Sequence, residues 1–250
     1  MITRRALVRS LAAGGGLLLS GCDALDGNPK FREILRSSEG LTMRAQRLIV
    51  DRNALAREFT PADLSPIFRA NGTRMPGSPE YAALAADRFV NWRLAVDGLV
   101  ARPLSLSLAQ LGAMPARTQI TRHDCVEGWS AIGQWTGTPI KLILDAAGLH
   151  QSARYIVFHC ADSIGPAPYY ESIDLIDAFH PQTIMAWALN GHLLPIQNGA
   201  PLRLRVERQL GYKHAKYLER IEAVASLAGI RGGRGGFWED GSDYEWYAGI

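Results

Sequence analysis

Apolar residues recur at mainly helical spacing over residues 41–59, with Leu41, Leu48 and Leu55 among them. The next residues, 60–63, begin with a threonine that can cap a helix and continue with a proline, which suits the first helical position. We therefore expect a packing helix followed by a short helical or turn segment. The polar residues 23–40 before them are expected to act as a tether.

From Trp92 onward the pattern changes to short strand-like runs separated by turn residues. Asn190-Gly191 predicts a tight hairpin turn, and Gly148 is placed to end a helix that begins at Pro139. The predicted strands are residues 94–96, 99–100, 155–160, 183–189, 192–196, 202–207 and 221–225. This mixture of strands and helices, without an internal repeat, predicts one main α+β domain over residues 61–250.

The first 21 residues have the layout of an export signal. Arg4 and Arg5 lie before a short apolar stretch that is too short to span a bilayer. Their order resembles a twin-arginine signal. The following residues, Leu19-Ser20-Gly21-Cys22, resemble a bacterial lipobox, in which Cys22 becomes the lipidated N-terminus. We expect an extracytoplasmic, periplasmic lipoprotein with residues 1–21 removed and residues 22–60 forming a tether and a helical arm.

Removal of this signal changes the charge of the protein. The chain has 27 basic and 24 acidic side chains, and three of the arginines lie in residues 1–21. The mature protein is therefore formally neutral, which gives no electrostatic basis for binding nucleic acid. Twin-arginine export carries folded proteins, so it favours a cofactor that is inserted before export.

Three cysteines are present, and lipidation of Cys22 would leave Cys125 and Cys160. In an oxidising compartment these two could form a disulfide. Cys125 follows Arg122 and His123, which could favour the thiolate that binds metals. From the residues alone a disulfide, a metal ligand and a buried structural cysteine remain open for Cys125.

Three motifs in order resemble the sulfite oxidase superfamily, and more closely the bacterial periplasmic protein-methionine-sulfoxide reductase catalytic subunits. The first is Cys125-Val126-Glu127-Gly128-Trp129-Ser130, followed by residues 135–139. The second is Gln197-Asn198-Gly199-Ala200-Pro201-Leu202-Arg203, and the third is Gly211-Tyr212-Lys213-His214-Ala215-Lys216. The resemblance extends from about Asn71 to Glu222 and implies a sulfite oxidase-like molybdopterin-binding fold.

The resemblance also implies roles for individual residues. Cys125 would be the thiolate ligand of a mononuclear molybdenum held by molybdopterin, a metal that favours soft sulfur donors. His123 could contact the substrate or tune the metal, although a packed histidine fits the sequence equally well. The residues expected to bind the pterin or its phosphate are Asn71, Cys160, Asn198, Arg203, His214, Ala215 and Lys216.

The sequence also departs from its relatives. Val126-Glu127-Gly128 follows the cysteine where animal sulfite oxidases have an Ala-Gly-Asn run, so sulfite is not the expected substrate. We expect oxygen-atom transfer, with reduction of a small or protein-borne S- or N-oxide favoured over oxidation. The chain has no haem-attachment motif, so electrons would be exchanged with a membrane haem protein or a soluble cytochrome.

Two other classes of protein fit parts of the pattern. His123, Cys125, His159 and Cys160 could form a zinc site, although their spacing matches no standard zinc signature. The chain could also be a cofactor-free binding lipoprotein with Cys125 and Cys160 oxidised to a disulfide.

Overall fold

The computed structural model describes residues 28–250, so the export signal and Cys22 lie outside the described residues. The chain divides into two units, residues 1–50 and residues 51–250. This division falls ten residues before the predicted start of the main domain at residue 61.

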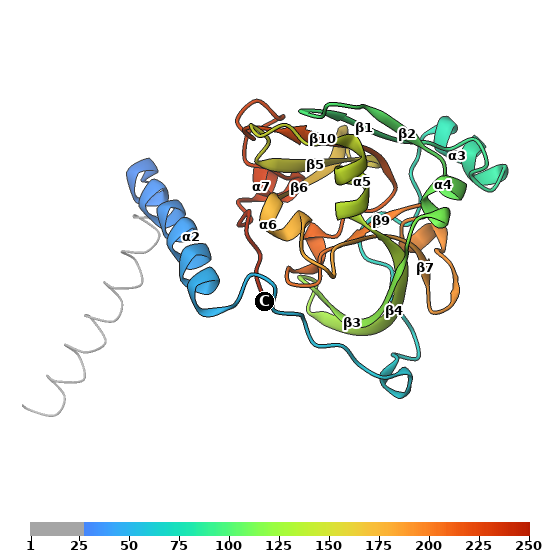
Figure 1. Cartoon of the computed structure of the whole chain (residues 1–250). Helices are drawn as coiled ribbons and strands as arrows, with labels where there is room; N and C mark the ends of the chain where they lie inside the picture. Colours follow the sequence, from blue (N-terminus) through green and yellow to red (C-terminus); the bar gives the residue numbers. More distant parts are fainter. Residues whose placement is uncertain (1–27) are drawn as a thin grey trace, which may run out of the picture. The chain divides into compact units, whose positions relative to one another are not determined.

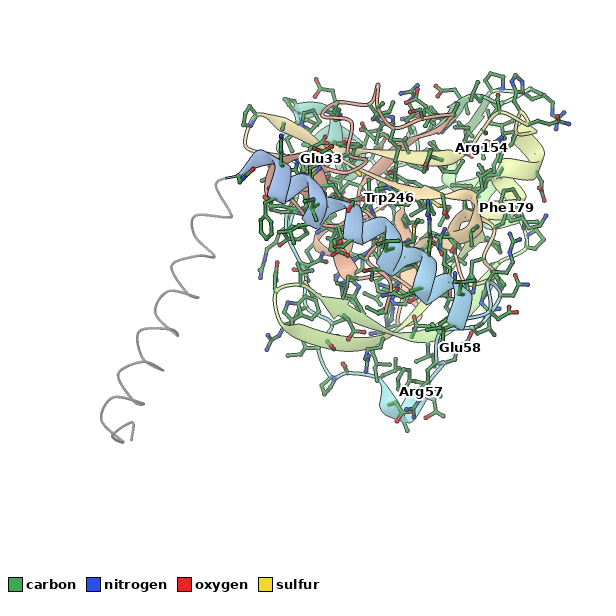
Figure 2. The ribbon with its side chains drawn as sticks, turned by 90° about the vertical axis from the view of Figure 1, so that its left-hand side faces the viewer. Glu33, Arg57, Glu58, Arg154, Phe179 and Trp246 are labelled. Carbon is green, nitrogen blue, oxygen red and sulfur yellow. The ribbon has the colours of Figure 1, made fainter. Side chains whose placement is uncertain are left out.

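The described part of the first unit is one helix, α2 (Pro29–Ile49). Asn28 caps it by accepting a hydrogen bond from the backbone N–H of Lys30, and a proline lies in its first turn. The predicted helix over residues 41–59 therefore begins earlier and ends ten residues sooner. Beyond the helix, residues 55–57 have no regular structure. Glu58, labelled in Figure 2, pairs with Thr121 as an isolated bridge.

The second unit contains two β-sheets, of which the first is mixed and the second antiparallel (Figure 1). The first sheet has the order β2-β1-β10-β5-β6, in which β1 and β10 are parallel and the other neighbours antiparallel. Its strands are β1 (Leu94–Gly98), β2 (Leu104–Leu106), β5 (Tyr155–Ile164), β6 (Ala167–Asp174) and β10 (Leu218–Val224).

The second sheet has the order β3-β4-β7-β8, and β9 also pairs with β7. Its strands are β3 (Arg117–Cys125), β4 (Trp129–Pro139), β7 (Ile184–Leu189), β8 (His192–Leu193) and β9 (Arg203–Arg205). The predicted Asn190-Gly191 hairpin is confirmed between β7 and β8, and both turn residues have positive φ. The long β3–β4 hairpin was not predicted.

The main hydrophobic core includes side chains from both sheets and from α5 (Ile140–Ala147). Ile140, Ile143, Leu144 and Ala147 are fully buried, which is the i, i+3, i+4, i+7 stripe of an amphipathic helix. Gly148 ends α5 with φ 70°, as predicted. Leu202, Leu204 and Val206, around β9, join the same core.

Short helices connect the strands. They are η1 (Pro61–Asp63), α3 (Pro79–Ala86), α4 (Leu108–Ala113), α6 (Leu175–Ala178), η2 (Ile196–Asn198), η3 (Gly211–Lys213) and α7 (Phe237–Ser242). In residues 28–250 no helix is both long and apolar enough to cross a bilayer. The predicted α+β class is confirmed.

Candidate active site

Cys125 is the last residue of β3, directly before the turn that leads into β4. Side chains alternate along a strand, so His123 and Cys125 face the interior while Arg122 and Asp124 lie toward the other side. Gly128 closes the turn with φ 84°, a conformation that suits glycine. The Cys125 side chain is therefore held at the edge of the sheet by a regular strand and a tight turn.

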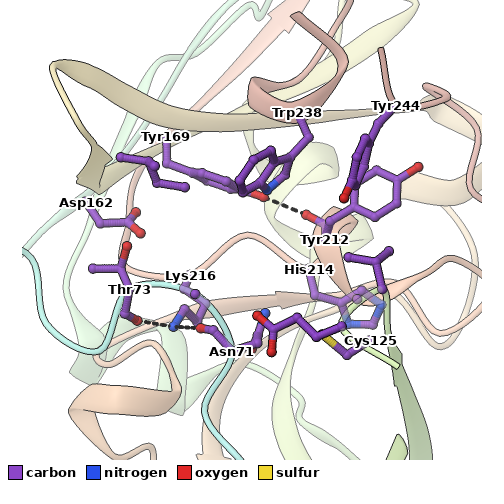
Figure 3. Close-up of a pocket in the computed structure, with 15 residues that line it drawn as sticks. Asn71, Thr73, Cys125, Asp162, Tyr169, Tyr212, His214, Lys216, Trp238 and Tyr244 are labelled. Atoms are coloured by element: carbon purple, nitrogen blue, oxygen red, sulfur yellow. Dashed lines mark hydrogen bonds between the residues drawn. The ribbon is translucent and has the colours of Figure 1, made fainter. Parts of the chain in front are cut away.

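The Cys125 side chain lines a cavity with a volume of about 190 Å³ (Figure 3). Burial raises the pKa of its thiol, an effect opposed by a backbone hydrogen bond from Glu127 and by the charge of Arg203. The other residues lining the cavity are Asn71, Gly72, Thr73, Val126, Glu127, Asp162, Ile164, Tyr169, Gly211, Tyr212, His214, Lys216, Trp238 and Tyr244.

Two buried cations lie beside this cavity. The Arg203 guanidinium is fully buried, and it donates to the backbone oxygen of Asn198 at 3.1 Å and to Asn71 Oδ1 at 3.3 Å. Lys216 Nζ donates to the backbone oxygens of Asn71, at 2.6 Å, and of Thr73. Burial is the main cause that lowers the pKa of Arg203 to about 9 and that of Lys216 to about 7.

Among the described residues neither Arg203 nor Lys216 forms an ion pair, whereas neighbouring buried cations do. Arg205 is fully buried and contacts Glu207 at 2.6 Å. Lys213 lies 2.5 Å from a carboxylate oxygen of Glu239. Burying an unpaired charge is costly, so the unpaired state of Arg203 and Lys216 points to an anionic ligand.

The same region contains buried polar atoms without a partner in the described structure. They are Nε2 of His123, Nδ2 of Asn198, Nε of Arg203 and Nδ1 of His214. Most buried polar groups in proteins are hydrogen-bonded. The unpaired N–H groups of His123, Asn198 and Arg203 fit acceptors on a bound group. Nδ1 of His214 is itself an acceptor, because the neutral ring donates from Nε2 to the backbone oxygen of Gln209, so this atom fits a donor on the same group. Together with the buried thiol, the two cations and these atoms fit a molybdopterin whose metal binds Cys125.

His123 lies behind the cavity and is not among the residues that line it. Its Nδ1 lies 3.0 Å from Arg205, so the neutral ring accepts there and carries its proton on Nε2. Burial is the main cause that lowers the pKa of His123 well below its usual value, with the nearby Arg203 charge adding to it. His123 is therefore placed to donate from Nε2.

Two of the predicted cofactor contacts, Cys160 and Ala215, do not line the cavity. Cys160 is packed in the hydrophobic core and does not line the cavity, and its buried thiol has a pKa well above the usual value. Ala215 is also a core residue, and its backbone N–H donates to the oxygen of Lys213. The backbone N–H of His214 donates to Gly211, which leaves its ring as the part that lines the cavity.

The structure adds cavity residues that the sequence did not single out as site residues. Asp162 lines the cavity with Oδ1 unbonded, and Tyr169, Tyr212, Trp238 and Tyr244 form an aromatic side. No local motif marks these positions, because they come together only through the pairing of β5 with β6 and the placement of α7.

The zinc-site alternative is not supported by the geometry. In residues 28–250 no group of three or more histidine, cysteine, aspartate or glutamate side chains is placed to hold a metal ion. His159 lies 2.8 Å from Glu222, while Cys160 packs in the core. Cys125 and Cys160 are both free thiols, so the structure contains no disulfide between them.

A family model described as the oxidoreductase molybdopterin binding domain matches residues 81–228, which contain Cys125, Arg203 and Lys216. The chain belongs to this family. Together with the relative described next that covers most of the chain, this makes it a molybdenum-dependent oxidoreductase of the sulfite oxidase superfamily with molybdopterin as its cofactor.

Three known proteins illustrate the relationship. A putative protein-methionine-sulfoxide reductase subunit YedZ1 from Azospira oryzae is 37% identical over 247 residues, which cover 98% of this chain and 87% of the relative. The protein-methionine-sulfoxide reductase catalytic subunit MsrP from Ralstonia nicotianae is 37% identical over 52% of this chain and 43% of its own length. The crystal structure of the sulfane dehydrogenase SoxCD from Paracoccus pantotrophus has a TM-score of 0.51 at 21% identity, over 55% of this chain and 39% of that one. The last comparison confirms the predicted fold.

Proposed function

We propose that this protein reduces sulfoxides, with methionine sulfoxide, free or protein-borne, as the first candidate substrate. The observation that carries the proposal is the Cys125 thiol at the edge of a cavity with a cationic side and an aromatic side. The full-length likeness to a relative named as a methionine-sulfoxide reductase subunit supports the choice of substrate.

When bound, the cofactor supplies a metal that changes its oxidation state by two electrons. Reduction of a sulfoxide consumes two electrons and two protons and releases a thioether and water. In this reaction the chain's own residues hold the cofactor through Cys125, Arg203 and Lys216, and present Nε2–H of His123 from behind the site. The electrons come from a separate redox partner, for which a membrane haem protein or a soluble cytochrome fits the expected location.

The test combines metal analysis with two assays on protein purified from a molybdenum-replete host. We expect about one molybdenum per chain, consumption of a reduced viologen dye when methionine sulfoxide is added, and little oxidation of sulfite. A loaded protein that oxidises sulfite and leaves sulfoxides unchanged would contradict the proposed substrate and direction.

We also propose that the mature protein is tethered to the outer face of the cytoplasmic membrane through lipid on Cys22. The first support is the arginine pair and lipobox in residues 1–22. The second is α2, whose residues Ile34, Leu41 and Leu48 recur at helical spacing and are mostly exposed, as in helices that lie on a bilayer.

Fractionation of cells tests the tether. The wild type should be found with membranes, Cys22→Ala in the soluble periplasmic fraction, and the double change of Arg4 and Arg5 to lysine in the cytoplasm. Membrane association that persists in Cys22→Ala would argue against lipid as the anchor.

A further inference from the structure

The chain beyond the family match, residues 229–250, supplies a side of the cavity. Trp238 and Tyr244 come from α7 and the residue after its cap, and both line the same cavity as Cys125. Figure 3 shows Trp238, Tyr244 and Tyr212 along one side, with Lys216 and Asn71 on the opposite side.

The aromatic side is one continuous surface. The Trp238 and Tyr244 rings are stacked with centroids 5.7 Å apart, and Tyr244 meets Tyr212 edge to face at 5.0 Å. Trp238 and Tyr244 are only half buried, so they can still contact a ligand. Lys216 lies on the other side together with Asn71, to which Arg203 donates, and these two cations suit the anionic cofactor (Figure 3). The aromatic side suits apolar groups that flank a sulfur atom, since thioether sulfur and methyl groups pack favourably against rings.

Buried polar contacts hold this side in place. Glu239, next to Trp238, is fully buried, and its Oε1 lies 2.5 Å from Nζ of Lys213. Asp240 accepts from the backbone N–H groups of Gly232 and Arg234, each at 2.9 Å, and from the hydroxyl of Tyr170.

A second set of contacts holds the rest of the C-terminal segment. Trp246 Nε1 donates to Ser172 Oγ at 2.8 Å, and the Tyr212 hydroxyl donates to the backbone oxygen of Glu245 at 2.6 Å. A segment fixed at so many points can present its rings in one geometry, which a selective surface requires.

We propose that Trp238 and Tyr244 select the substrate, by contacting the apolar substituents on its sulfur, and that the Glu239–Lys213 pair positions them. This inference rests on the proposed sulfoxide reduction. It assigns the substrate class more narrowly: sulfoxides with at least one apolar or aromatic substituent are preferred over small hydrophilic oxides.

The test compares the holoenzyme with Trp238→Ala and with Tyr155→Ala as a matched control. Tyr155 packs edge to face on Trp246 of the same segment, at 5.5 Å, but does not line the cavity. For Trp238→Ala we expect KM for methyl p-tolyl sulfoxide to rise roughly tenfold and KM for dimethyl sulfoxide to rise about twofold, because fewer apolar contacts are lost with the smaller substrate. We expect kcat and the molybdenum content to stay near the wild-type values.

The control should keep both KM values. The same rise for both substrates would overturn the inference, because the ring would then not discriminate between them. Loss of molybdenum from Trp238→Ala would also overturn it, since the ring would then support the cofactor.

A binding measurement separates this inference from the proposed function. Methyl p-tolyl sulfone resembles the substrate but does not undergo the reaction, and its binding can be followed by isothermal titration calorimetry, which does not depend on the tryptophan that is replaced. The wild type and Tyr155→Ala should bind it, and Trp238→Ala should bind it about tenfold more weakly. If the wild type reduces no sulfoxide yet binds the sulfone more tightly than Trp238→Ala does, the proposed function is wrong, but the inference that the aromatic side binds the apolar substituents is supported. Equal binding by all three proteins would overturn the inference alone.

Discussion

Cys125 and Cys160 are both buried thiols, but only Cys125 lines the cavity. Replacing each by serine makes the same chemical change at two different places. Cys125→Ser should lose most of its molybdenum, because a hydroxyl is a poor ligand where the metal favours a soft thiolate. Cys160→Ser should keep molybdenum and lose about 1–2 kcal/mol of stability, because it buries a hydroxyl in the core.

Metal analysis and thermal unfolding measure both effects. Full metal retention in Cys125→Ser would contradict the ligand assignment. Metal loss of the same size in Cys160→Ser would show instead that this core position supports the cofactor.

At the scale of single residues, the structure brings several of the predicted site residues together. Cys125, Lys216, His214 and Asn71 line one cavity, and Arg203 contacts Asn71, as a set of cofactor contacts should. What the sequence could not give is which cations are paired. Arg203 and Arg205 are two residues apart on one strand, and only Arg205 meets a carboxylate in the described structure. That difference depends on tertiary contacts that no local pattern records.

Among the elements, η3 and its glycine place His123 and the third motif side by side. A Cβ on Gly211 would lie 2.6 Å from Nε2 of His123 and 3.1 Å from the backbone oxygen of Asp124. The ring is buried and held by Arg205, so it has little room to move. Gly211→Ala should therefore cost about 1–3 kcal/mol of unfolding free energy, as overpacking does, and should lower the molybdenum content.

Gly112→Ala is the control, because a Cβ there meets nothing within 4 Å. Alanine in this helical position should be neutral or should stabilise by about 0.5–1 kcal/mol. Chemical unfolding of both variants measures these changes in unfolding free energy. If Gly211→Ala unfolds like the wild type and keeps its metal, the close approach to His123 is not a constraint.

The β3–β4 hairpin was not predicted from the sequence, and the composition of β3 explains why. The inward positions of β3 include Gln119, Thr121 and His123, which are polar and buried. A strand with polar residues on its inner face gives no apolar alternation to detect. These side chains face a polar interior, with Gln119 bonded to Glu207 and His123 to Arg205. The polar inner face of β3 is therefore the reason why the sequence pattern does not predict the strand that carries Cys125.

Across the whole molecule, three distant elements meet in one buried cluster. Lys213 of η3 lies 2.5 Å from Glu171 of β6 and 2.5 Å from Glu239 of α7, and all three side chains are buried. The sequence analysis identified the third motif, which contains η3, but it predicted neither β6 nor α7. The pairing of these charges depends on chain segments about 30 to 70 residues apart in sequence.

This cluster gives the fold a pH dependence. Burial is the main cause that raises the pKa of Glu171 well above the usual value of 4.5, and the nearby Glu239 adds to it, while Lys213 opposes it. The folded protein therefore holds a proton on Glu171 at pH values where the unfolded chain has lost it. The stability from this proton is fully present below about pH 4.5 and is lost as pH rises through the raised pKa.

Glu171→Gln removes this titration and keeps a neutral side chain of the same shape. Relative to the wild type, its unfolding free energy should improve as pH rises above 4.5, by up to about 1.4 kcal/mol per pH unit until the raised pKa is passed. Urea unfolding at several pH values measures this offset, and Glu80→Gln, an exposed carboxylate on α3, reports the general effect of removing an acidic side chain. An offset for Glu171→Gln that does not change with pH would mean that Glu171 is charged in the folded protein. Lys213 would then hold α7 against two carboxylates rather than one.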